Sequence, residues 1–205
     1  ETYELTKFAF ELSEQIGGPV FVRLVTNNSQ SHACIEIEER ILPPESQPLP
    51  VRDTAKFTKA GAAICMTQHR DLIARLAKAE EIIAQQDRNR MRLGKKDGVG
   101  IISVGITNGY QNEALESLSE AGVDVSEISS LELIASIPFA KEKIETMISH
   151  CSTLLIAEEL EGHIEKYVYM QAYKMGKQVK ILGKEDGTYE RIGEYDAQIL
   201  RKGIC

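Results

Sequence analysis

The sequence lacks several features that would narrow its function at once. It has no run of about 20 apolar residues, so we expect no membrane span, and we expect no signal peptide. The four cysteines, Cys34, Cys65, Cys151 and Cys205, are far apart and form no C-x-x-C pair. This spacing excludes a zinc or iron–sulfur site assembled locally. We interpret the cysteines as reduced thiols and predict a cytoplasmic protein.

A positive charge excess is missing too. The formal net charge is -7, which disfavours nonspecific binding to nucleic acid or to anionic lipid. The 205 residues are 42% hydrophobic and 27% charged, values typical of a globular domain. The chain begins with Glu1 rather than Met and opens directly on an amphipathic segment. We therefore expect an internal portion of a longer protein.

Residues 1–40 are predicted to be the tail of a domain whose start is absent. Leu5, Phe8, Leu12 and Ile16 share one helical face, and Gly17-Gly18 ends that helix. "PVFVRLVTN" then has the β-branched composition of a buried strand, and "CIEIEE" alternates like a short edge strand. A helix with one strand is half of a crossover unit.

Residues 41–96 are predicted to be a linker and a long helix. The linker contains Pro43, Pro44, Pro48 and Pro50, which favour extended, irregular backbone. From Ala62 a helical stripe runs on to residue 93, where the chain turns basic before a glycine, as a helix end should. Its members are Cys65, His69, Leu72, Leu76, Ala79 and Ile83. A helix of about 30 residues is too long for a small core and would bridge two bodies.

Residues 97–205 are predicted to form a complete α/β domain. Expected strands lie within 99–106, 125–137, 152–159 and 178–184, and expected helices lie within 108–122, 140–151, 162–176 and 196–204. The alternation with short turns predicts a parallel sheet covered by helices on both faces, a three-layer sandwich.

Glu158 and Glu159 are the first candidates for a site because they end the third of these strands. Ligands of open α/β sheets meet the carboxyl ends of strands, and burial can hold one of two adjacent acids protonated. However, neighbours in a strand point to opposite faces. The alternative is that one acid caps the helix starting at Gly162 while the other meets solvent or a neighbouring subunit.

Two loops are further candidates for ligand contact. "VGITNGYQNE" places Gly105, Asn108 and Gly109 between a strand and a helix, where free N–H groups bind anions. A tight turn capped by Asn explains this stretch equally well. "RLVTNNSQSH" is the densest polar group after a strand, with Arg23, Thr26, Asn28, Ser31 and His32. It is either a ligand-facing loop or a loop bonded within itself.

The remaining polar motifs favour structural roles. Ser31 and His32 are adjacent, and no acid is placed to orient the imidazole, so we expect no nucleophile pair and no catalytic residue. His150 and His163 lack partners at the spacing of metal ligands, so we expect no metal site. The three tyrosines at 167, 169 and 173 are predicted to pack their helix onto the sheet.

Taken in order, these segments resemble the alpha subunits of the indolepyruvate:ferredoxin oxidoreductases, within the thiamine-diphosphate-dependent 2-oxoacid:ferredoxin oxidoreductases. The resemblance is carried by "AFELSEQIGGPVFVRLVTNNSQSH", "HRDLIARLAKAEE", "GIISVGITNGYQNEAL", "LLIAEELEGHIEKYV" and "GKEDGTYERIGEYDAQILRKGI". It covers nearly the whole chain. "LVTNNSQSHAC" departs from the threonine-rich loop of the family, which bears on whether Arg23, Thr26, Ser31 and His32 approach a cofactor.

The resemblance implies three parts: the end of a pyrimidine-binding domain (1–40), a linker with its helix (41–96) and a domain like the transketolase C-terminal domain (97–205). It implies that Glu158 and Glu159, with Gly105 and Asn108, organise domain contacts rather than chemistry. The parent enzyme would oxidatively decarboxylate aryl 2-oxoacids with thiamine diphosphate, magnesium, 4Fe–4S clusters and coenzyme A.

The same resemblance implies partners: the rest of the alpha subunit, a beta subunit and ferredoxin, with subunit or homo-oligomer contacts and neither nucleic acid nor membrane. We expect the chain alone to hold no cofactor and to be inactive, since it has no G-D-G…N segment. Two alternatives stay open. One is a stand-alone binding or assembly module of the same fold, and the other is a flavodoxin-like ligand-binding enzyme that uses the strand ends at Gly105 and Glu158.

Overall fold

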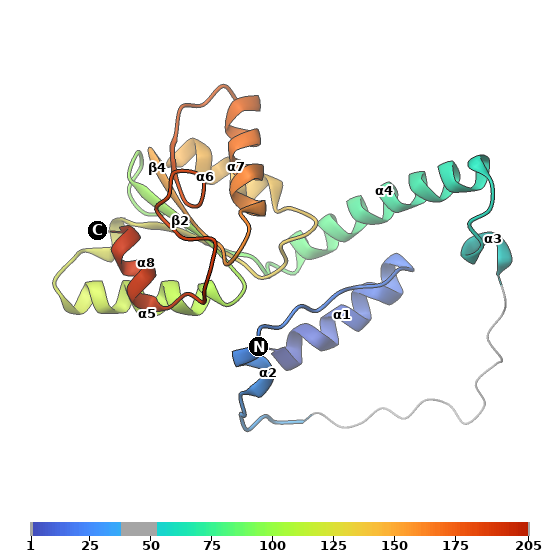
Figure 1. The fold of residues 1–205 in the computed structure, drawn as a ribbon, viewed down its shortest axis with the longest axis horizontal. Coiled ribbons are helices and arrows are strands. Elements are labelled where there is room, and N and C mark those ends of the chain that lie inside the picture. The colour runs from blue at the N-terminus through green and yellow to red at the C-terminus, as the bar shows by residue number, and fades with distance from the viewer. Residues whose placement is uncertain (1, 38–52, 205) are drawn as a thin grey trace. The chain divides into compact units, whose positions relative to one another are not determined.

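The structure is a computed structural model that describes residues 2–37 and 53–204 (Figure 1). The chain divides into two compact units, Glu1–Lys78 and Ala79–Cys205. The division falls inside helix α4, Ala62–Gln85. Residues Ala79–Arg92, which the sequence assigned to the linker, thus lie in the second unit, while the prediction of three domains stays a prediction.

The first unit contains helices, among them most of α4, and no strand among its described residues. Helix α1, Thr2–Ile16, buries Phe8 and Leu12 on the predicted face, and Gly17 follows with φ 62°, a left-handed conformation that glycine adopts freely. Helix α2 spans Thr26–Gln30 and helix α3 spans Thr54–Phe57. The amphipathic helix predicted at the start is therefore confirmed.

The strand predicted at "PVFVRLVTN" is wrong. The segment has no regular structure up to Val25 and enters α2 at Thr26, and Phe21 is 91% exposed. The short edge strand is wrong over Cys34–Ile37, which is also irregular, and its last residues lie outside the described ranges. A strand is stabilised by hydrogen bonds to a neighbouring strand, and the described part of the first unit offers no such neighbour.

The long helix predicted over residues 62–93 is shorter than expected. It ends at Gln85, and Arg90–Arg92 form strand β1. Asp87 has φ 46°, which breaks the helical path. The Asn89 side chain then accepts from the N–H groups of Ile134 and Ala135 at 2.8 and 2.9 Å. These bonds hold the residues before β1 against the end of a distant strand.

The predicted helical stripe is buried only near its end. Ala79 and Ile83 are buried, whereas Cys65, Leu72 and Leu76 are exposed. Burial of the stripe is therefore confined to the last turns of the helix, and the apolar side chains of its earlier turns are exposed among the described residues.

The second unit is a five-stranded sheet between two helical layers (Figure 1). The remaining strands are β2 Val99–Val104, β3 Ser129–Leu133, β4 Thr153–Ala157 and β5 Lys180–Leu182. Their order is β1-β3-β2-β4-β5, with β2, β3, β4 and β5 parallel and β1 antiparallel to β3. The predicted α/β sandwich is confirmed, with a mixed rather than purely parallel sheet because β1 was not expected.

Two helix pairs cover the two faces of this sheet. Helices α6 Lys141–His150 and α7 His163–Lys174 bury Ile144, Met147, Ile164 and Val168 on one face, against Ile102 and Ile156. Helices α5 Thr107–Glu120 and α8 Ala197–Ile204 bury Ala114, Leu115 and Leu200 on the other, against Ile101 and Leu155. A single-turn 3-10 helix, Val125–Glu127, precedes β3. Adjacent strand residues serve opposite faces because side chains alternate along a strand.

Gly100 marks a close approach within this core. A Cβ atom at this position would lie 2.6 Å from the Cys151 Sγ and 2.8 Å from the Met147 Cε. Only glycine therefore fits where β2 passes under α6. Cys151 is buried at this contact, and burial raises the pKa of its thiol, so its role is packing.

Candidate functional site

Several polar residues, most of them buried, gather where β4 and β5 end. We call Glu158, Glu159, Glu165, Lys184 and Tyr195 the strand-end cluster. Such clusters at the carboxyl ends of parallel strands are where open α/β sheets meet ligands. The hydrogen bonds of each member decide whether the strand-end cluster is free to bind a ligand.

Glu158 caps helix α7. It is buried, and its Oε2 accepts from the Ile164 N–H at 2.9 Å, with Gly162 as the preceding N-cap residue. Burial raises the pKa of this carboxyl, and the N–H groups of Ile164 and Glu165 oppose that rise. A carboxylate is also favoured at a helix N-terminus by the helix dipole. This arrangement is the capping alternative that the sequence left open.

Glu159 bonds to a different part of the second unit from the one that Glu158 caps. Its Oε1 accepts from the Tyr195 N–H at 3.0 Å, which ties the end of β4 to the segment that leads into α8. The two adjacent acids therefore hold two separate backbone groups and do not converge on one point. Glu159 is half-buried, so it keeps some of the solvent contact expected for the second acid, and a contact with a neighbouring subunit stays a prediction.

Glu165 is the functional residue that the sequence reasoning missed. Its side chain is fully buried, and its two oxygens accept from the N–H groups of Lys184 at 2.7 Å and Glu185 at 3.1 Å. A Cβ at Gly183 would lie 2.7 Å from the Glu165 carboxylate, so the turn after β5 is built around this group. The signal in the sequence was an acid directly after an apolar helix residue, Ile164, in the quoted "GHIEKYV".

Lys184 completes the cluster. It is buried, and its Nζ donates to the Glu190 carbonyl and to the Tyr195 hydroxyl, over whose ring it lies at 4.2 Å. Burial lowers the pKa of this lysine, and the charges of Glu158 and Glu165 act in the opposite direction. A buried lysine can keep its positive charge when carboxylates lie nearby and its N–H groups are hydrogen-bonded. The strand-end cluster thus fixes the loop between β5 and α8.

The second candidate loop is also internally bonded. Gly105 has φ 64°, and its N–H donates to the Leu133 carbonyl at 2.9 Å. Asn108 is buried, accepts from the Ser103 hydroxyl at 2.7 Å and donates to Leu133 at 3.2 Å. The Thr107 hydroxyl donates to the Ala157 carbonyl at 2.6 Å. These bonds join the ends of β2, β3 and β4, so the geometry suits a structural role in which the loop holds the strand ends together.

The four residues predicted near a cofactor all lie in the first unit. Arg23, Thr26, Ser31 and His32 are exposed, and Thr26 begins α2. The Ser31 hydroxyl donates to the Asn28 carbonyl at 2.9 Å. Over the described ranges, no hydrogen bond or ion pair joins any two of these four side chains, so their assignment to a cofactor stays a prediction.

In the described part of the chain, no group of three or more His, Cys, Asp or Glu residues is placed so that it could hold a metal ion. His150 instead bonds the Gly94 carbonyl through Nε2 at 3.1 Å. Among described residues Cys34, Cys65 and Cys151 are free thiols. Of the helices in residues 2–37 and 53–204, none has the length and apolar content needed to cross a bilayer.

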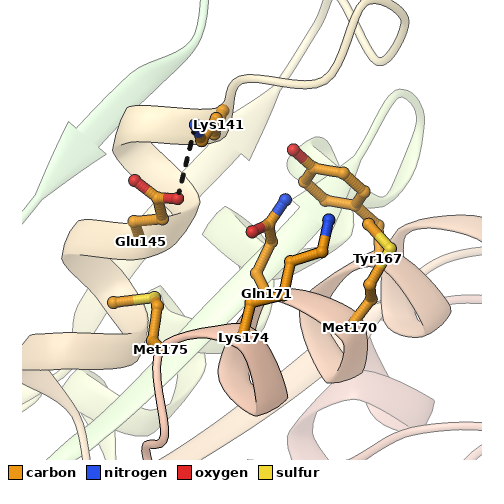
Figure 2. Close-up of a pocket in the computed structure, with 7 residues that line it drawn as sticks. All are labelled: Lys141, Glu145, Tyr167, Met170, Gln171, Lys174 and Met175. Atoms are coloured by element: carbon orange, nitrogen blue, oxygen red, sulfur yellow. Dashed lines mark ion pairs between the residues drawn. The ribbon is translucent and has the colours of Figure 1, made fainter.

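A hollow of about 440 Å³ opens between α6 and α7, and Figure 2 shows its lining side chains. They are Lys141, Glu145, Tyr167, Met170, Gln171, Lys174 and Met175. The Tyr167 ring stacks on Phe139 at 3.9 Å between centroids. The prediction that all three tyrosines of this helix pack onto the sheet is wrong, because Tyr173 is 88% exposed.

Comparison with known proteins gives relatives over the whole chain, although no protein-family model matches. The indolepyruvate oxidoreductase subunit IorA of Methanothermobacter thermautotrophicus is 30% identical over 205 residues, which are 100% of this chain and 32% of the relative. The IorA subunit of Thermococcus kodakarensis is 30% identical over 192 residues, 90% of this chain and 28% of the relative. The chain thus spans about a third of the length of these relatives.

Among solved structures, a 2-oxoglutarate:ferredoxin oxidoreductase from Magnetococcus marinus, with 2-oxoglutarate, coenzyme A and succinyl-CoA bound, matches with a TM-score of 0.51 at 15% identity. The match covers 71% of this chain and 23% of that chain. An inactive tetramer of a split-gene transketolase matches with a TM-score of 0.43 at 16% identity, over 56% of this chain and 40% of that chain.

The described sheet and its helices thus define an α/β fold that is also present in the 2-oxoglutarate:ferredoxin oxidoreductase of Magnetococcus marinus. In sequence, the chain is a relative of the indolepyruvate oxidoreductase subunits IorA. The resemblance inferred from its sequence motifs is confirmed.

Proposed function

We propose that this chain supplies a non-catalytic, architectural part of a 2-oxoacid:ferredoxin oxidoreductase of the indolepyruvate type. The observation that carries the proposal is the bonding of the strand-end carboxylates. Glu158, Glu159 and Glu165 each accept from backbone N–H groups. A carboxylate whose oxygens accept hydrogen bonds from backbone N–H groups is poorly placed to exchange protons with a substrate.

The same bonding argues against a cofactor site at these strand ends. A magnesium diphosphate group needs carboxylate or carbonyl oxygens that face the ligand. Here the acidic oxygens face N–H groups, and the Asn108 amide is used between β2 and β3. The residues at the strand ends therefore do not fit thiamine diphosphate with its metal.

The parent enzyme proposed for the chain decarboxylates aryl 2-oxoacids oxidatively to acyl-CoA. Thiamine diphosphate, magnesium and 4Fe–4S clusters would be held by other parts of it, and coenzyme A would be a co-substrate. A beta subunit, the rest of the alpha subunit and ferredoxin are the proposed partners. The apolar side chains exposed on the first unit, among them Phe10, Phe21 and Phe57, support such contacts, because a large apolar surface usually marks an interface.

Calorimetric titration of the chain tests this proposal. Thiamine diphosphate with magnesium, coenzyme A and flavin mononucleotide are added separately. We expect no saturable heat for any of them up to about 1 mM. Any binding would then have a free energy weaker than about -4 kcal/mol. Micromolar affinity for thiamine diphosphate would refute the architectural role, and micromolar affinity for the flavin would favour the flavodoxin-like alternative. If either ligand binds, the Glu158→Gln and Glu159→Gln variants show whether the strand ends hold it.

A further inference from the structure

The segment that runs from α7 through β5 differs in composition from the rest of this acidic chain. Residues 166–184 contain five lysines, three tyrosines and two methionines but no Asp or Glu, although the chain as a whole has a net charge of -7. Tyr173 and Met170 are 88% and 41% exposed. Tyrosine and methionine are enriched at protein interfaces, and no core packing requires them in these exposed positions.

Two lysines of this segment, Lys174 and Lys177, are available for a partner. Lys174 and Lys177 are exposed and, over the described ranges, form no ion pair. Lys141 is 3.9 Å from Glu145 across one helical turn, a separation at which an exposed pair contributes little. Exposed cations without partners select a ligand of opposite charge and accelerate its approach.

The hollow between α6 and α7 lies beside these groups. In Figure 2 the nitrogens of Lys174 and Gln171 point toward the same side of the hollow as Tyr167. The Met170 and Met175 thioethers supply soft apolar contacts that adapt to the shape of an inserted side chain. At about 440 Å³ the hollow is large enough to seat one aromatic or branched side chain with carboxylates around it.

We propose that the hollow and the adjoining face of α7 (Tyr173, Lys174 and Lys177) dock an acidic protein segment through one apolar anchor residue. This inference deepens the proposed function, on which it rests, by naming the surface and the kind of partner. A protein segment is favoured over an anionic bilayer because a hollow between two helices seats a single side chain rather than a flat surface.

The test uses the whole chain and an acidic peptide that contains a single tryptophan between Asp and Glu residues. The chain has no tryptophan, so the fluorescence of the peptide reports binding directly. We expect saturable binding tighter than about 1 mM that weakens with added salt. A peptide with serine in place of tryptophan, and one with lysine in place of each acid, are expected not to bind.

Variants then locate the site. The double reversal Lys174→Glu with Lys177→Glu is expected to weaken peptide binding at least about tenfold, and Tyr173→Ser is expected to weaken it as well. The matched control, Lys96→Glu with Lys202→Glu, changes two other exposed lysines by the same charge and is expected to leave binding unchanged. Circular dichroism confirms that each variant is folded.

Four outcomes would overturn the docking proposal. They are no binding at about 1 mM, equal affinity for the lysine peptide, equal loss in the control variant, and binding to phosphatidylglycerol vesicles in place of the peptide. Self-association that Tyr173→Ser abolishes, without peptide binding, would assign the face to a second copy instead. Thiamine diphosphate titration is independent of these results: cofactor binding beside normal peptide binding overturns only the architectural role, and absence of both overturns only the docking.

Discussion

Replacing Glu165 tests whether the strand-end cluster holds the second unit together. The Glu165→Gln variant keeps the side-chain volume but removes the charge and presents an amide NH₂ to one of two backbone N–H donors. The wild-type carboxylate accepts from Lys184 and Glu185 at 2.7 and 3.1 Å. Hydrogen bonds to a charged group contribute about 1.5–3 kcal/mol each, and one bond can survive in the variant. We therefore expect the free energy of unfolding to fall by about 2–4 kcal/mol.

Urea unfolding followed by tyrosine fluorescence measures this change. The chain has no tryptophan, and of its seven tyrosines only Tyr3 lies in the first unit, so the signal reports the second unit. With a slope of about 2 kcal/mol per molar urea, the middle of the usual range, the expected loss moves the midpoint down by about 1–2 M. Amide exchange at residues 184 and 185 is expected to accelerate, because their acceptor is weakened.

A surface acid provides the control. Glu161 is exposed and pairs with Arg191 at 2.9 Å, so Glu161→Gln is expected to cost less than about 1 kcal/mol. If Glu165→Gln unfolds at the wild-type midpoint, the buried carboxylate does not hold the turn after β5, and the structural role assigned to the strand-end cluster is wrong.

Three further substitutions in the second unit give testable predictions. Gly100→Ala places a Cβ 2.6 Å from the Cys151 Sγ and is expected to cost about 1–3 kcal/mol in urea unfolding, part of which returns when Cys151→Ala is added; strict additivity would contradict the clash. Glu158 has its pKa raised by burial in the folded chain, so its ionisation opposes folding increasingly as pH rises from about 4.3, the unfolded value, through the folded pKa. Glu158→Gln should therefore gain stability relative to wild type between pH 4 and pH 7, and a constant difference would refute this. Gln111 is fully buried and, among the described residues, its amide has no hydrogen-bond partner; Gln111→Met is expected to raise the thermal midpoint by removing an unmet desolvation cost of about 1–3 kcal/mol, and a lower midpoint would show that the amide is bonded.

The sequence located the elements of the sandwich well because their signals are local. The apolar runs around Ile102 and Ile156 and the helical stripe through Ile164 and Val168 are each complete within about a dozen residues. Gly122 and Gly176, with φ 88° and 63°, end α5 and α7 where the sequence predicted. Each of these features depends on a side chain and its near neighbours.

Elements that depend on distant partners were predicted poorly. Arg90–Arg92 has a basic composition that suits the end of a helix, and it becomes a strand only because β3 offers it a free edge. Conversely, residues 19–25 have the composition of a strand but remain irregular in the described structure. Pairing between strands is non-local, so composition alone cannot decide it.

The candidate site divides in the same way. The sequence placed Glu158, Glu159, Gly105 and Asn108 at strand ends, because that position follows from the alternation of elements. It did not reveal that Glu165 and Lys184 are buried, since both resemble ordinary exposed charges of a helix and a turn. Glu165 bonds to backbone groups about twenty residues away along the chain, and the Lys184 side chain bonds to Glu190 and Tyr195 in the following loop.

By itself the sequence determined the alternation of strands and helices, the positions of the strand-end acids and the resemblance to the indolepyruvate oxidoreductase subunits, since all three are recorded in local patterns and their order. Only the tertiary structure decided the fate of each polar group: which backbone N–H it holds, which strand gains β1 as a neighbour, and which tyrosines face outward. The physical reason is that hydrogen bonding and burial are settled by the contacts between segments far apart in the chain.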